Sequence, residues 1–418
     1  MELYNPLSQR IEPFTLGDAP VTVYVCGVTP YDTTHLGHAF TYTTFDILIR
    51  YLESHGHEVR YAQNVTDIDD DVLRKAKQVG EDWMALGNRW TAHFIRDMQS
   101  LNVRPPDFYP RATDMIPDIV GEVQQLLTAG VAYEAGGSVY FHVDAWPEFG
   151  KLSHLAPHEM LPIANERGNR PDDPNKQAPL DFVLWQAQAP GEPAWESPWG
   201  LGRPGWHIEC STMSHRFLGA TLDIHGGGAD LAFPHHESEI AQAEAVGEQR
   251  PFVRFWMHTA MVRHEGEKMS KSLGNLVMVR DLLQTWSPDG LRLYMAAHHY
   301  REAWSHDERE LAEGEQVARA LCQAATVAGG PGEPLSGLAA LPEFDQAMDH
   351  DLDTLAAEKV MAGLANEIVR GAQAGRNVAP AQDALRRMAR VFGLRLDAPG
   401  PEPRVVAGWA EHLKRFAD

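Results

Sequence analysis

Four side chains that lie far apart in the sequence have the chemistry to hold one zinc ion: Cys26, Cys210, His235 and Glu239. His235 and Glu239 are four residues apart, so on a helix they share a face. Two thiolates, an imidazole and a carboxylate form a reasonable zinc shell. A thiolate is a strong zinc ligand and a hydroxyl a poor one, so this shell favours a substrate that carries a thiol. The alternative is structural, with Cys26 in the core and His235 and His236 as a helix-cap pair.

Two short motifs suit phosphate chemistry. The first, HLGH, begins at His35 after a predicted strand and ends at His38 inside a predicted helix. A helix N-terminus binds anionic phosphate, glycine permits a close backbone approach, and imidazoles can donate hydrogen bonds. The second, KMSKS, offers Lys268 and Lys271 to neutralise a pyrophosphate leaving group. Each motif alone could be surface histidines or a solvated basic loop, but the two in this order favour a nucleotide site.

Two further segments are suited to a polar ligand. Asn64, Val65 and Thr66 end a predicted strand, and parallel sheets place ligands at such ends. The glycine run GGGAD at residues 226–230 could approach a base or a ribose closely. The structural alternatives are a strand-to-helix turn, with the aspartates at 67, 69, 70 and 71 capping the next helix, and a tight glycine turn.

The elements that must position these side chains form a βαβ unit. Residues 21–26 and 58–64 are β-rich and predict strands, while residues 39–54 have the apolar spacing of a helix. Such units favour a parallel sheet with right-handed crossovers. The sequence further predicts helices at residues 83–101 and 115–129, a strand at 139–143, a loop-rich segment at about 150–205, a flexible linker at 329–334 and a small helical bundle towards the C-terminus.

Length and composition agree with a globular protein of two or three domains. The 418 residues include 36 Lys and Arg against 58 Asp and Glu, a net charge of −22 that argues against a broad nucleic-acid surface. No apolar run reaches the ~20 residues of a membrane span, and we expect neither a signal peptide nor a membrane partner. Three cysteines cannot form a disulfide framework, which favours a cytoplasmic protein whose thiols bind metal.

Six segments in this order resemble the cysteinyl-tRNA synthetase superfamily. They are CGVT at residues 26–29, HLGH at 35–38, NVTDIDD at 64–70, GRPGWHIECS at 202–211, FPHHE at 233–237 and the KMSKS loop. The resemblance implies an α/β fold: a class I synthetase Rossmann-like (HUP) catalytic domain over residues 1–300, with an insertion at about 108–203. A C-terminal helical bundle over residues 301–418, without a recognisable anticodon-binding tail, is expected to follow.

The resemblance also implies a reaction and a site. The carboxylate of cysteine would attack the α-phosphate of ATP, with magnesium on the ATP and zinc on the thiol. The implied zinc ligands are Cys26, Cys210, His235 and Glu239, and the implied catalytic residues are His35, His38, Lys268 and Lys271. The implied pocket for cysteinyl-adenylate consists of Cys26, Gly27, Val28, Thr29, Thr41, Asn64, Val65, Thr66, Trp206, Gly228, Ala229, Asp230 and Val262.

Two members of the superfamily fit the sequence, and both first make cysteinyl-adenylate. One esterifies tRNA; the other, the mycothiol-pathway cysteine ligase, joins cysteine to the amine of glucosaminyl-inositol. TPYDTTHLGHA at residues 29–39 is similar to a motif of the second member, and ERGNRP resembles its ERGGDP, differing at Asn169 and Arg170.

These two motifs make glucosaminyl-inositol the predicted acceptor. Glu239 is similar to the fourth zinc ligand of the tRNA enzyme, so tRNA-Cys and another small amine are alternatives. The alternative from another class is a catalytically silent paralogue that binds cysteine or a tRNA acceptor stem. We expect a monomer.

Overall fold

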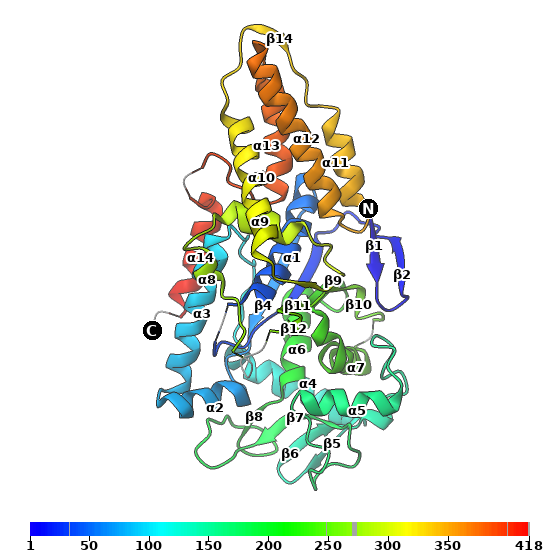
Figure 1. Cartoon of the computed structure of the whole chain (residues 1–418). Helices are drawn as coiled ribbons and strands as arrows, with labels where there is room; N and C mark the ends of the chain where they lie inside the picture. Colours follow the sequence, from blue (N-terminus) through cyan, green and yellow to red (C-terminus); the bar gives the residue numbers. More distant parts are fainter. Residues whose placement is uncertain (33, 248, 270–273, 399, 417–418) are drawn as a thin grey trace.

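The centre of the molecule is a parallel sheet with the strand order β10-β9-β3-β4 (Figure 1). The computed structural model describes residues 1–32, 34–247, 249–269, 274–398 and 400–416. The four strands are β3 (Val21–Val28), β4 (Val59–Val65), β9 (Leu222–Gly228) and β10 (Val253–Thr259). Because helices cover both faces, β3 and β4 are buried along most of their length, as is usual for parallel strands. The predicted βαβ unit and parallel sheet are confirmed.

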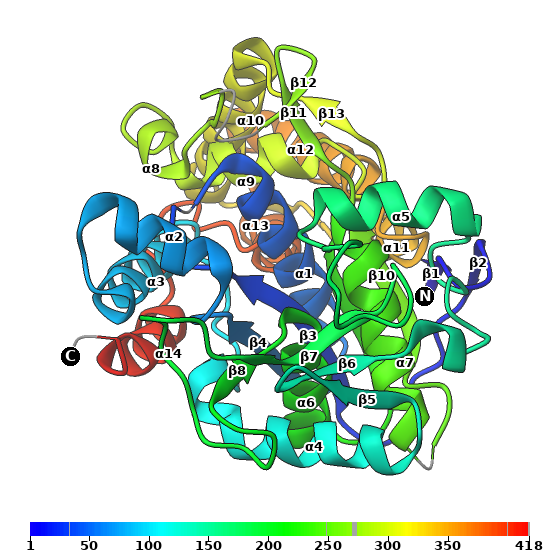
Figure 2. The same ribbon diagram turned by 90° about the horizontal axis from the view of Figure 1, so that it is seen from below.

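The pleat of β3 divides the core into two layers. The helices that cover the sheet are α1 (Leu36–Ser54), α6 (Trp206–Leu218) and α7 (Glu237–Val246). Val23 and Val25 pack in the cluster that contains the side chains of α1, whereas Tyr24 and Cys26 pack with those of α6 and α7. Figure 2 shows α1 on one side of β3 and α6 on the other. The alternation turns the Cys26 thiol toward the helices that carry two of the other predicted metal ligands, Cys210 on α6 and Glu239 on α7.

Helix α1 begins at Leu36, three residues before the start that its apolar spacing predicts. The reason is a cap made by the HLGH motif itself. The Nδ1 atom of His35 accepts from the N–H of Gly37 at 3.1 Å, and Nδ1 of His38 accepts from the N–H of His35 at 3.4 Å. These reciprocal bonds satisfy backbone donors that the first turn of a helix otherwise leaves open.

The segment between β4 and β9 carries a second sheet, which is antiparallel and has the order β5-β6-β7-β8. Its strands are β5 (Ala132–Ala135), β6 (Ser138–Phe141), β7 (Phe182–Ala187) and β8 (Gly202–Pro204). The same segment contains α2 (Asp70–Val79), α3 (Trp83–Ser100), η1 (Ala112–Met115), α4 (Ile116–Thr128), η2 (Val143–Ala145) and α5 (Pro157–Glu166). The prediction of a loop-rich stretch at about 150–205 is wrong for α5, β7 and β8. Helix α5 contains Pro162, and β7 and β8 span only six and three residues, which is too short to show a hydrophobic period.

Helices dominate the C-terminal part, and α10 to α13 project as a bundle at the end of the molecule opposite the antiparallel sheet (Figure 1). The helices are α8 (Val279–Leu282), α9 (Pro288–Ala296), α10 (Glu308–Thr326), α11 (Ala340–Asp349), α12 (Thr354–Gln373), α13 (Ala379–Val391) and α14 (Pro403–Lys414). Helix α14 returns to pack on α3, and the indole of Trp409 donates to the carbonyl of Val103 at 2.8 Å. The division of the chain at residue 300 stays a prediction.

Short strands complete the fold. They are β1 (Glu2–Asn5), β2 (Arg10–Pro13), β11 (Val262–His264), β12 (Glu267–Lys268), β13 (Trp304–Ser305), β14 (Gly332–Pro334) and β15 (Arg376–Asn377). The prediction of a flexible linker at 329–334 is wrong, because β14 pairs with β15 and the glycines permit close packing. A Cβ at Gly330 would lie 2.2 Å from the carbonyl oxygen of Gly375. Among the described helices, none has the length and apolar character that a membrane span requires.

A buried ion network joins α1 to the C-terminal part. The Asp46 carboxylate contacts Arg50 Nε at 2.9 Å and Arg292 Nη2 at 2.5 Å, and all three side chains are almost fully buried. Arg50 also contacts Glu402 at 2.7 Å. Burial alone would raise the pKa of Asp46, but the two guanidinium groups hold it below its ordinary value. The network therefore fixes the helix that begins with the HLGH motif against α9 and the segment before α14.

Replacing Arg292 with Met should destabilise the protein by about 3–5 kcal/mol, because Asp46 then loses one of its two buried cationic partners. Urea unfolding followed by circular dichroism measures the change. Arg216→Met is the matched control, since Arg216 pairs with Asp118 on the exposed surface and its loss should change stability little. Equal shifts for the two variants would show that the buried network has no special role.

Candidate active site and metal centre

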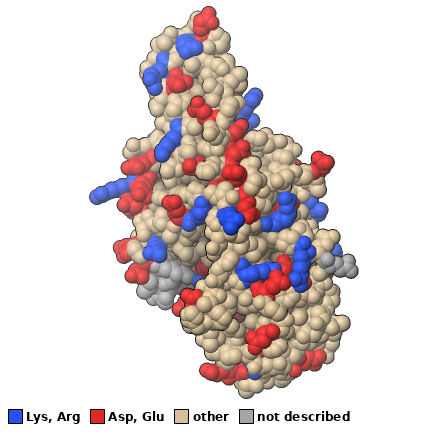
Figure 3. Space-filling view, turned by 90° about the vertical axis from the view of Figure 1, so that its right-hand side faces the viewer, with Lys and Arg blue, Asp and Glu red and all other residues tan. Residues whose placement is uncertain are grey.

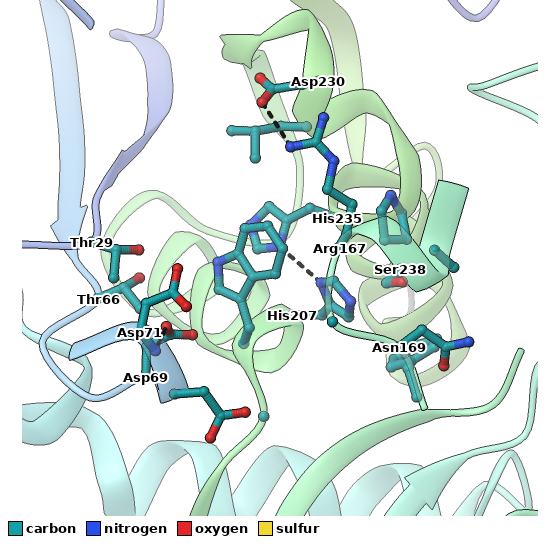
Figure 4. A pocket seen from close by; sticks show the side chains of 18 of the residues that line it. Thr29, Thr66, Asp69, Asp71, Arg167, Asn169, His207, Asp230, His235 and Ser238 are labelled. Atoms are coloured by element: carbon teal, nitrogen blue, oxygen red, sulfur yellow. Dashed lines mark hydrogen bonds and ion pairs between the residues drawn. The ribbon is translucent and has the colours of Figure 1, made fainter. Parts of the chain in front are cut away.

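A cavity of about 1750 Å³ opens at the carboxyl ends of β3, β4 and β9, between the parallel sheet and the antiparallel sheet of the insertion. Ligands of open parallel sheets bind at this edge. Figure 4 shows two facing walls: Thr29 and Thr66 lie on one, and Arg167, His207 and His235 lie on the other. The cavity is the place where the sequence-predicted residues meet.

The four predicted metal ligands converge at the floor of this region. Cys26 comes from β3, Cys210 from α6, His235 from η4 (Ala232–His236) and Glu239 from α7. Their ligand atoms all lie within 4.8 Å of one another, and all four residues are buried. The two sulfurs are 3.9 Å apart, close to the roughly 3.8 Å that two thiolates span in a tetrahedral zinc site. Nε2 of His235 lies 3.1 Å from Oε1 of Glu239, so the predicted shared face of these two residues is confirmed.

Sequence reasoning missed a second group of ligand atoms beside the first. His225 and His236 join Cys26 and Glu239 in an alternative set of four within the same 4.8 Å limit. Nε2 of His236 is 3.3 Å from the Cys26 sulfur, and Nε2 of His225 is 3.5 Å from it. Because both sets share Cys26 and Glu239, they describe one centre with two possible compositions. His225 directly precedes the glycine run and His236 follows the predicted ligand His235, but neither position has a spacing that marks it as a ligand.

The protonation states of the cluster suit a cation. Burial lowers the pKa of His225, His235 and His236 well below the ordinary value, so these imidazoles are neutral, which is the form that binds metal. Burial raises the pKa of Cys26 and of Glu239, and Oε2 of Glu239 is buried without a hydrogen-bond partner. A divalent ion would satisfy this oxygen and allow the thiols to ionise. The residues present therefore fit a bound metal.

Neighbouring side chains hold the histidines in place. Nδ1 of His235 shares a hydrogen bond of 2.9 Å with Nδ1 of His207, and Nδ1 of His236 shares one of 2.8 Å with Nε2 of His258. Trp206 stacks on the His235 ring with centroids 4.4 Å apart. Contacts of this kind fix the ring orientation and tautomer of metal-binding histidines.

The HLGH motif lies at another part of the cavity wall. Both imidazoles use Nδ1 as an acceptor in the helix cap, so each neutral ring carries its proton on Nε2 and can donate from that atom. His35 and His38 stack with centroids 3.7 Å apart, and both line the cavity. A phosphate there would meet two imidazole N–H groups at the N-terminus of a 19-residue helix.

The chain after the KMSKS loop is tied to the start of α1. The N–H of Leu36 donates to the carbonyl of Val277 at 2.8 Å, and the N–H of Val279 donates to the carbonyl of Thr34 at 3.1 Å. Lys268 ends β12, whereas Lys271 lies outside the described residues, as do its neighbours 270, 272 and 273. The two backbone bonds bring one end of the loop to the HLGH motif.

Most residues of the predicted adenylate pocket line the cavity: Cys26, Gly27, Val28, Thr29, Thr41, Asn64, Thr66, Trp206, Gly228, Asp230 and Val262. Val65 does not, because the pleat of β4 turns its side chain into the core cluster around α1. Ala229 is also absent from the lining residues. The hydroxyl of Thr66 donates to Oε2 of Glu209 at 2.9 Å, and the hydroxyls of Thr41 and Thr259 are 2.7 Å apart.

The glycine run is not the tight turn, and Asp67 is not the helix cap, that a purely structural role would make them. Gly226, Gly227 and Gly228 belong to β9 and do not form a tight turn. A Cβ at Gly226 would lie 2.0 Å from Cζ of Phe45, so this glycine permits the packing of α1 on the sheet. Asp69 caps α2 as expected, but Asp67 does not cap this helix.

The carboxylate of Asp67 instead accepts from the backbone N–H and the hydroxyl of Thr113, at 3.0 and 2.6 Å. This pairing ties the end of β4 to η1, at the start of the insertion.

An ion pair across the cavity was not predicted. Arg167, at the end of α5, donates to Asp230 in η3 (Ala229–Leu231) at 3.1 Å (Figure 4). Both residues line the cavity, so the pair connects the insertion to the carboxyl end of β9 directly over the predicted adenylate pocket. The arginine belongs to the ERGNRP segment, whose place in the fold the sequence pattern did not reveal.

The fold and the site define a class I aminoacyl-tRNA synthetase catalytic domain. The family described as "tRNA synthetases class I (C) catalytic domain" matches residues 14–316. Among solved structures, methionyl-tRNA synthetase from Mycobacterium tuberculosis with methionyl-adenylate is similar in fold, with a TM-score of 0.63, 16% identity and 95% and 93% coverage of the two chains.

The chain belongs to this family, and like its named relatives it is a ligase. A cysteine–tRNA ligase of Dehalococcoides mccartyi is 44% identical over 95% of this chain and 86% of that protein. The L-cysteine:1D-myo-inositol 2-amino-2-deoxy-alpha-D-glucopyranoside ligase of Thermomonospora curvata is 43% identical over 91% of each chain.

Zinc content distinguishes the two ligand sets. His235→Asn should weaken zinc binding by more than about 100-fold, because it removes a ligand, whereas His225→Asn should weaken it by about tenfold, the usual effect of a supporting residue. Competition with chelators of graded affinity, followed by metal analysis, measures both. Cys322→Ser is the control, because Cys322 lies on α10 away from the cluster. A larger loss for His225→Asn would assign the metal to the alternative set.

Proposed function

We propose that this ligase activates L-cysteine with ATP as cysteinyl-adenylate and transfers it to the amine of glucosaminyl-inositol, releasing AMP and pyrophosphate. One observation supports the first step. A buried cluster of Cys26, Cys210, His235 and Glu239 lies beside the cavity that the HLGH motif also lines. These residues would hold zinc. When bound, zinc supplies a position that prefers a thiolate to a hydroxyl, which selects cysteine over serine.

The residues around the cluster position the reacting groups. Trp206, which stacks on His235, would pack beside the side chain of the bound cysteine, and Asn64 and Thr66 line the cavity at the end of β4. Nε2–H groups of His35 and His38 would hold the phosphates of ATP at the helix N-terminus. Lys268 and Lys271 would neutralise the pyrophosphate that leaves when the cysteine carboxylate attacks, and magnesium would accompany ATP.

The charge of the cavity supports a cationic acceptor. Among the described side chains that line it, eight are acidic and five are basic. The acidic residues are Asp32, Asp69, Asp70, Asp71, Glu166, Asp172, Asp173 and Asp230, and the basic ones are Arg74, Arg167, Arg170, Lys176 and Arg203. On the face drawn in Figure 3, acidic and basic side chains are interspersed. A protonated amino sugar matches this acidic cavity better than the phosphate backbone of a nucleic acid does.

One sequence motif supports the same acceptor. The ERGNRP segment resembles a motif of the amino-sugar ligases, and its Arg167 reaches into the cavity to pair with Asp230. The relative from Thermomonospora curvata, which has that activity in its name, aligns with 91% of both chains. We therefore assign the segment to the acceptor side of the cavity.

Charging of tRNA-Cys is the second candidate. It is favoured by Glu239, which lies within the metal cluster and is similar to the fourth zinc ligand of the tRNA enzymes, and by the relative from Dehalococcoides mccartyi. Both candidates share the first step and differ only in the nucleophile that attacks the adenylate.

Cysteine-dependent exchange of pyrophosphate into ATP tests the first step. We expect kcat/KM for cysteine to exceed that for serine by about 10⁴-fold, the discrimination of a site that loses a strong polar partner with the wrong substrate. Removal of zinc should abolish the preference for cysteine over serine as well as lower the rate of exchange. Exchange that is absent with cysteine would establish a catalytically silent protein.

AMP release identifies the acceptor. The holoenzyme is incubated with cysteine and ATP, and with either glucosaminyl-inositol or a tRNA-Cys transcript. We expect turnover with the amino sugar, because its ammonium group matches the acidic cavity. Turnover with tRNA alone would make the protein a cysteine–tRNA ligase and overturn the proposed acceptor.

A further inference from the structure

The transfer step requires a proton acceptor that the metal cluster and the HLGH motif do not provide. An amino-sugar amine is largely protonated near neutral pH, and an ammonium nitrogen has no electron pair with which to attack a carbonyl carbon. Efficient aminolysis therefore needs a base inside the cavity whose pKa lies near the working pH. Carboxylates are the obvious candidates in an acidic cavity, and they differ in their hydrogen bonds and ion pairs.

Asp69 lies in the cavity wall next to the predicted adenylate pocket. It follows the carboxyl end of β4 by four residues and lines the cavity. Figure 4 shows Asp69 on the same wall as Thr29 and Thr66, facing His207 and Arg167 across the cavity. Thr29 and Thr66 belong to the predicted adenylate pocket, so this carboxylate borders the space in which the mixed anhydride would lie.

The carboxylate of Asp69 is fixed by its role in the backbone. As the N-cap of α2, its Oδ1 accepts from the N–H of Asp71 at 2.7 Å. One oxygen is therefore engaged by the cap while the residue lines the cavity, which is a defined position for a base. By contrast, Asp70 pairs with Arg203 and Asp71 pairs with Arg74, so each of these neighbours already has a guanidinium partner.

The surroundings of Asp69 make it a stronger base than an ordinary aspartate. Burial raises its pKa to about 6, opposed by the backbone N–H of Asp71 and supported by the nearby negative charges of Asp71 and Asp70. The charged and titratable groups that face it are Asp70 and Asp71 on α2, Arg203 on β8, Glu209 on α6 and Tyr31 in the loop after β3. Arg203 lowers the pKa only in part, since it is itself paired with Asp70 and Glu192.

We propose that Asp69 is the general base that takes the proton from the acceptor ammonium group; this role rests on the proposed function. The carboxylate accepts one proton, and the nitrogen electron pair attacks the carbonyl carbon of the adenylate. A C–N bond forms as the C–O bond to the phosphate breaks, and AMP leaves with that electron pair. The second N–H proton departs with the AMP phosphate, so the products are the amide, AMP and a protonated Asp69.

The substitution Asp69→Asn isolates this role. Asparagine caps helices as well as aspartate does, so α2 and the folded state are preserved, but the amide cannot accept the proton. The matched control is Asp82→Asn, because Asp82 caps α3 through the N–H groups of Met84 and Ala85 and does not line the cavity. The same chemical change is thus made at a neighbouring helix start.

Two nucleophiles are compared at pH 7 with the zinc-loaded enzyme. Glucosaminyl-inositol brings a protonated amine, whereas hydroxylamine is largely uncharged and needs no base to expose its electron pair. For Asp69→Asn we expect AMP release with the amino sugar to fall by about 100-fold or more, while cysteinyl-hydroxamate formation and pyrophosphate exchange stay close to wild type. Asp82→Asn should resemble the wild type in all three assays.

The pH profile gives a second measurement. With the amino sugar, the rate for Asp69→Asn should follow only the small uncharged fraction of the amine and rise about tenfold per pH unit, whereas the wild-type rate levels off above the pKa of Asp69. Equal losses with both nucleophiles, or an unchanged rate with the amino sugar, would overturn the base assignment. Failure of the proposed function is distinguishable, because the wild type itself would then release no AMP with the amino sugar.

Discussion

The close approach of β3 and β4 at Gly27 is the constraint on which the site depends. A Cβ at this position would lie 1.6 Å from the carbonyl oxygen of Asn64, so only glycine fits. The N–H of Gly27 donates to Oδ1 of Asn64 at 2.7 Å, which locks the two strand ends together. Cys26 precedes this contact and Thr66 follows it. The metal cluster and the ligand wall therefore take their relative positions from one backbone contact.

The two chemical centres are tied to different layers of the core. The metal cluster is built on α6, η4 and α7, whereas the HLGH motif begins α1 on the other face of the sheet. Because Asp46 and Arg50 anchor α1 to Arg292, the position of His35 depends on the C-terminal part of the chain. Stability of the α1 layer is thus a condition for catalysis, although none of its buried charges touches a substrate.

The sequence predicts this site better than it predicts the insertion, for physical reasons. Cys26, Cys210, His235 and Glu239 have donor atoms of the right type, and the i, i+4 spacing predicts the shared face of His235 and Glu239. That all four residues meet is implied by the family resemblance and not by their spacing. Val65 was predicted to line the pocket because it lies between Asn64 and Thr66 in the motif. On a strand, however, alternate residues point to opposite faces, and Val65 packs in the core.

The contact of Arg167 with Asp230 and the entry of His225 into the cluster depend on tertiary packing that no local pattern encodes. Within the insertion, α4 and β6 lie where the sequence predicts them, whereas β5, β7 and β8 are too short to show a hydrophobic period and α5 is interrupted by Pro162. The parallel sheet and α1 could therefore be predicted from the sequence, whereas the insertion's contribution to the cavity could not.

In the proposed function, the cavity binds an anionic nucleotide and a cationic acceptor, and these two ligands require opposite charges from the protein. ATP would bring several negative charges, which the N-terminus of α1 is suited to neutralise, yet eight carboxylates of the described residues line the same space. The conflict is resolved if the charges act on different partners at different walls. In the proposed function, the histidine end would hold phosphate and the wall of α2 would meet a cation, while Arg167 pairs with Asp230. In the proposed function, a single cavity can then receive an anionic nucleotide at one wall and a cationic acceptor at another.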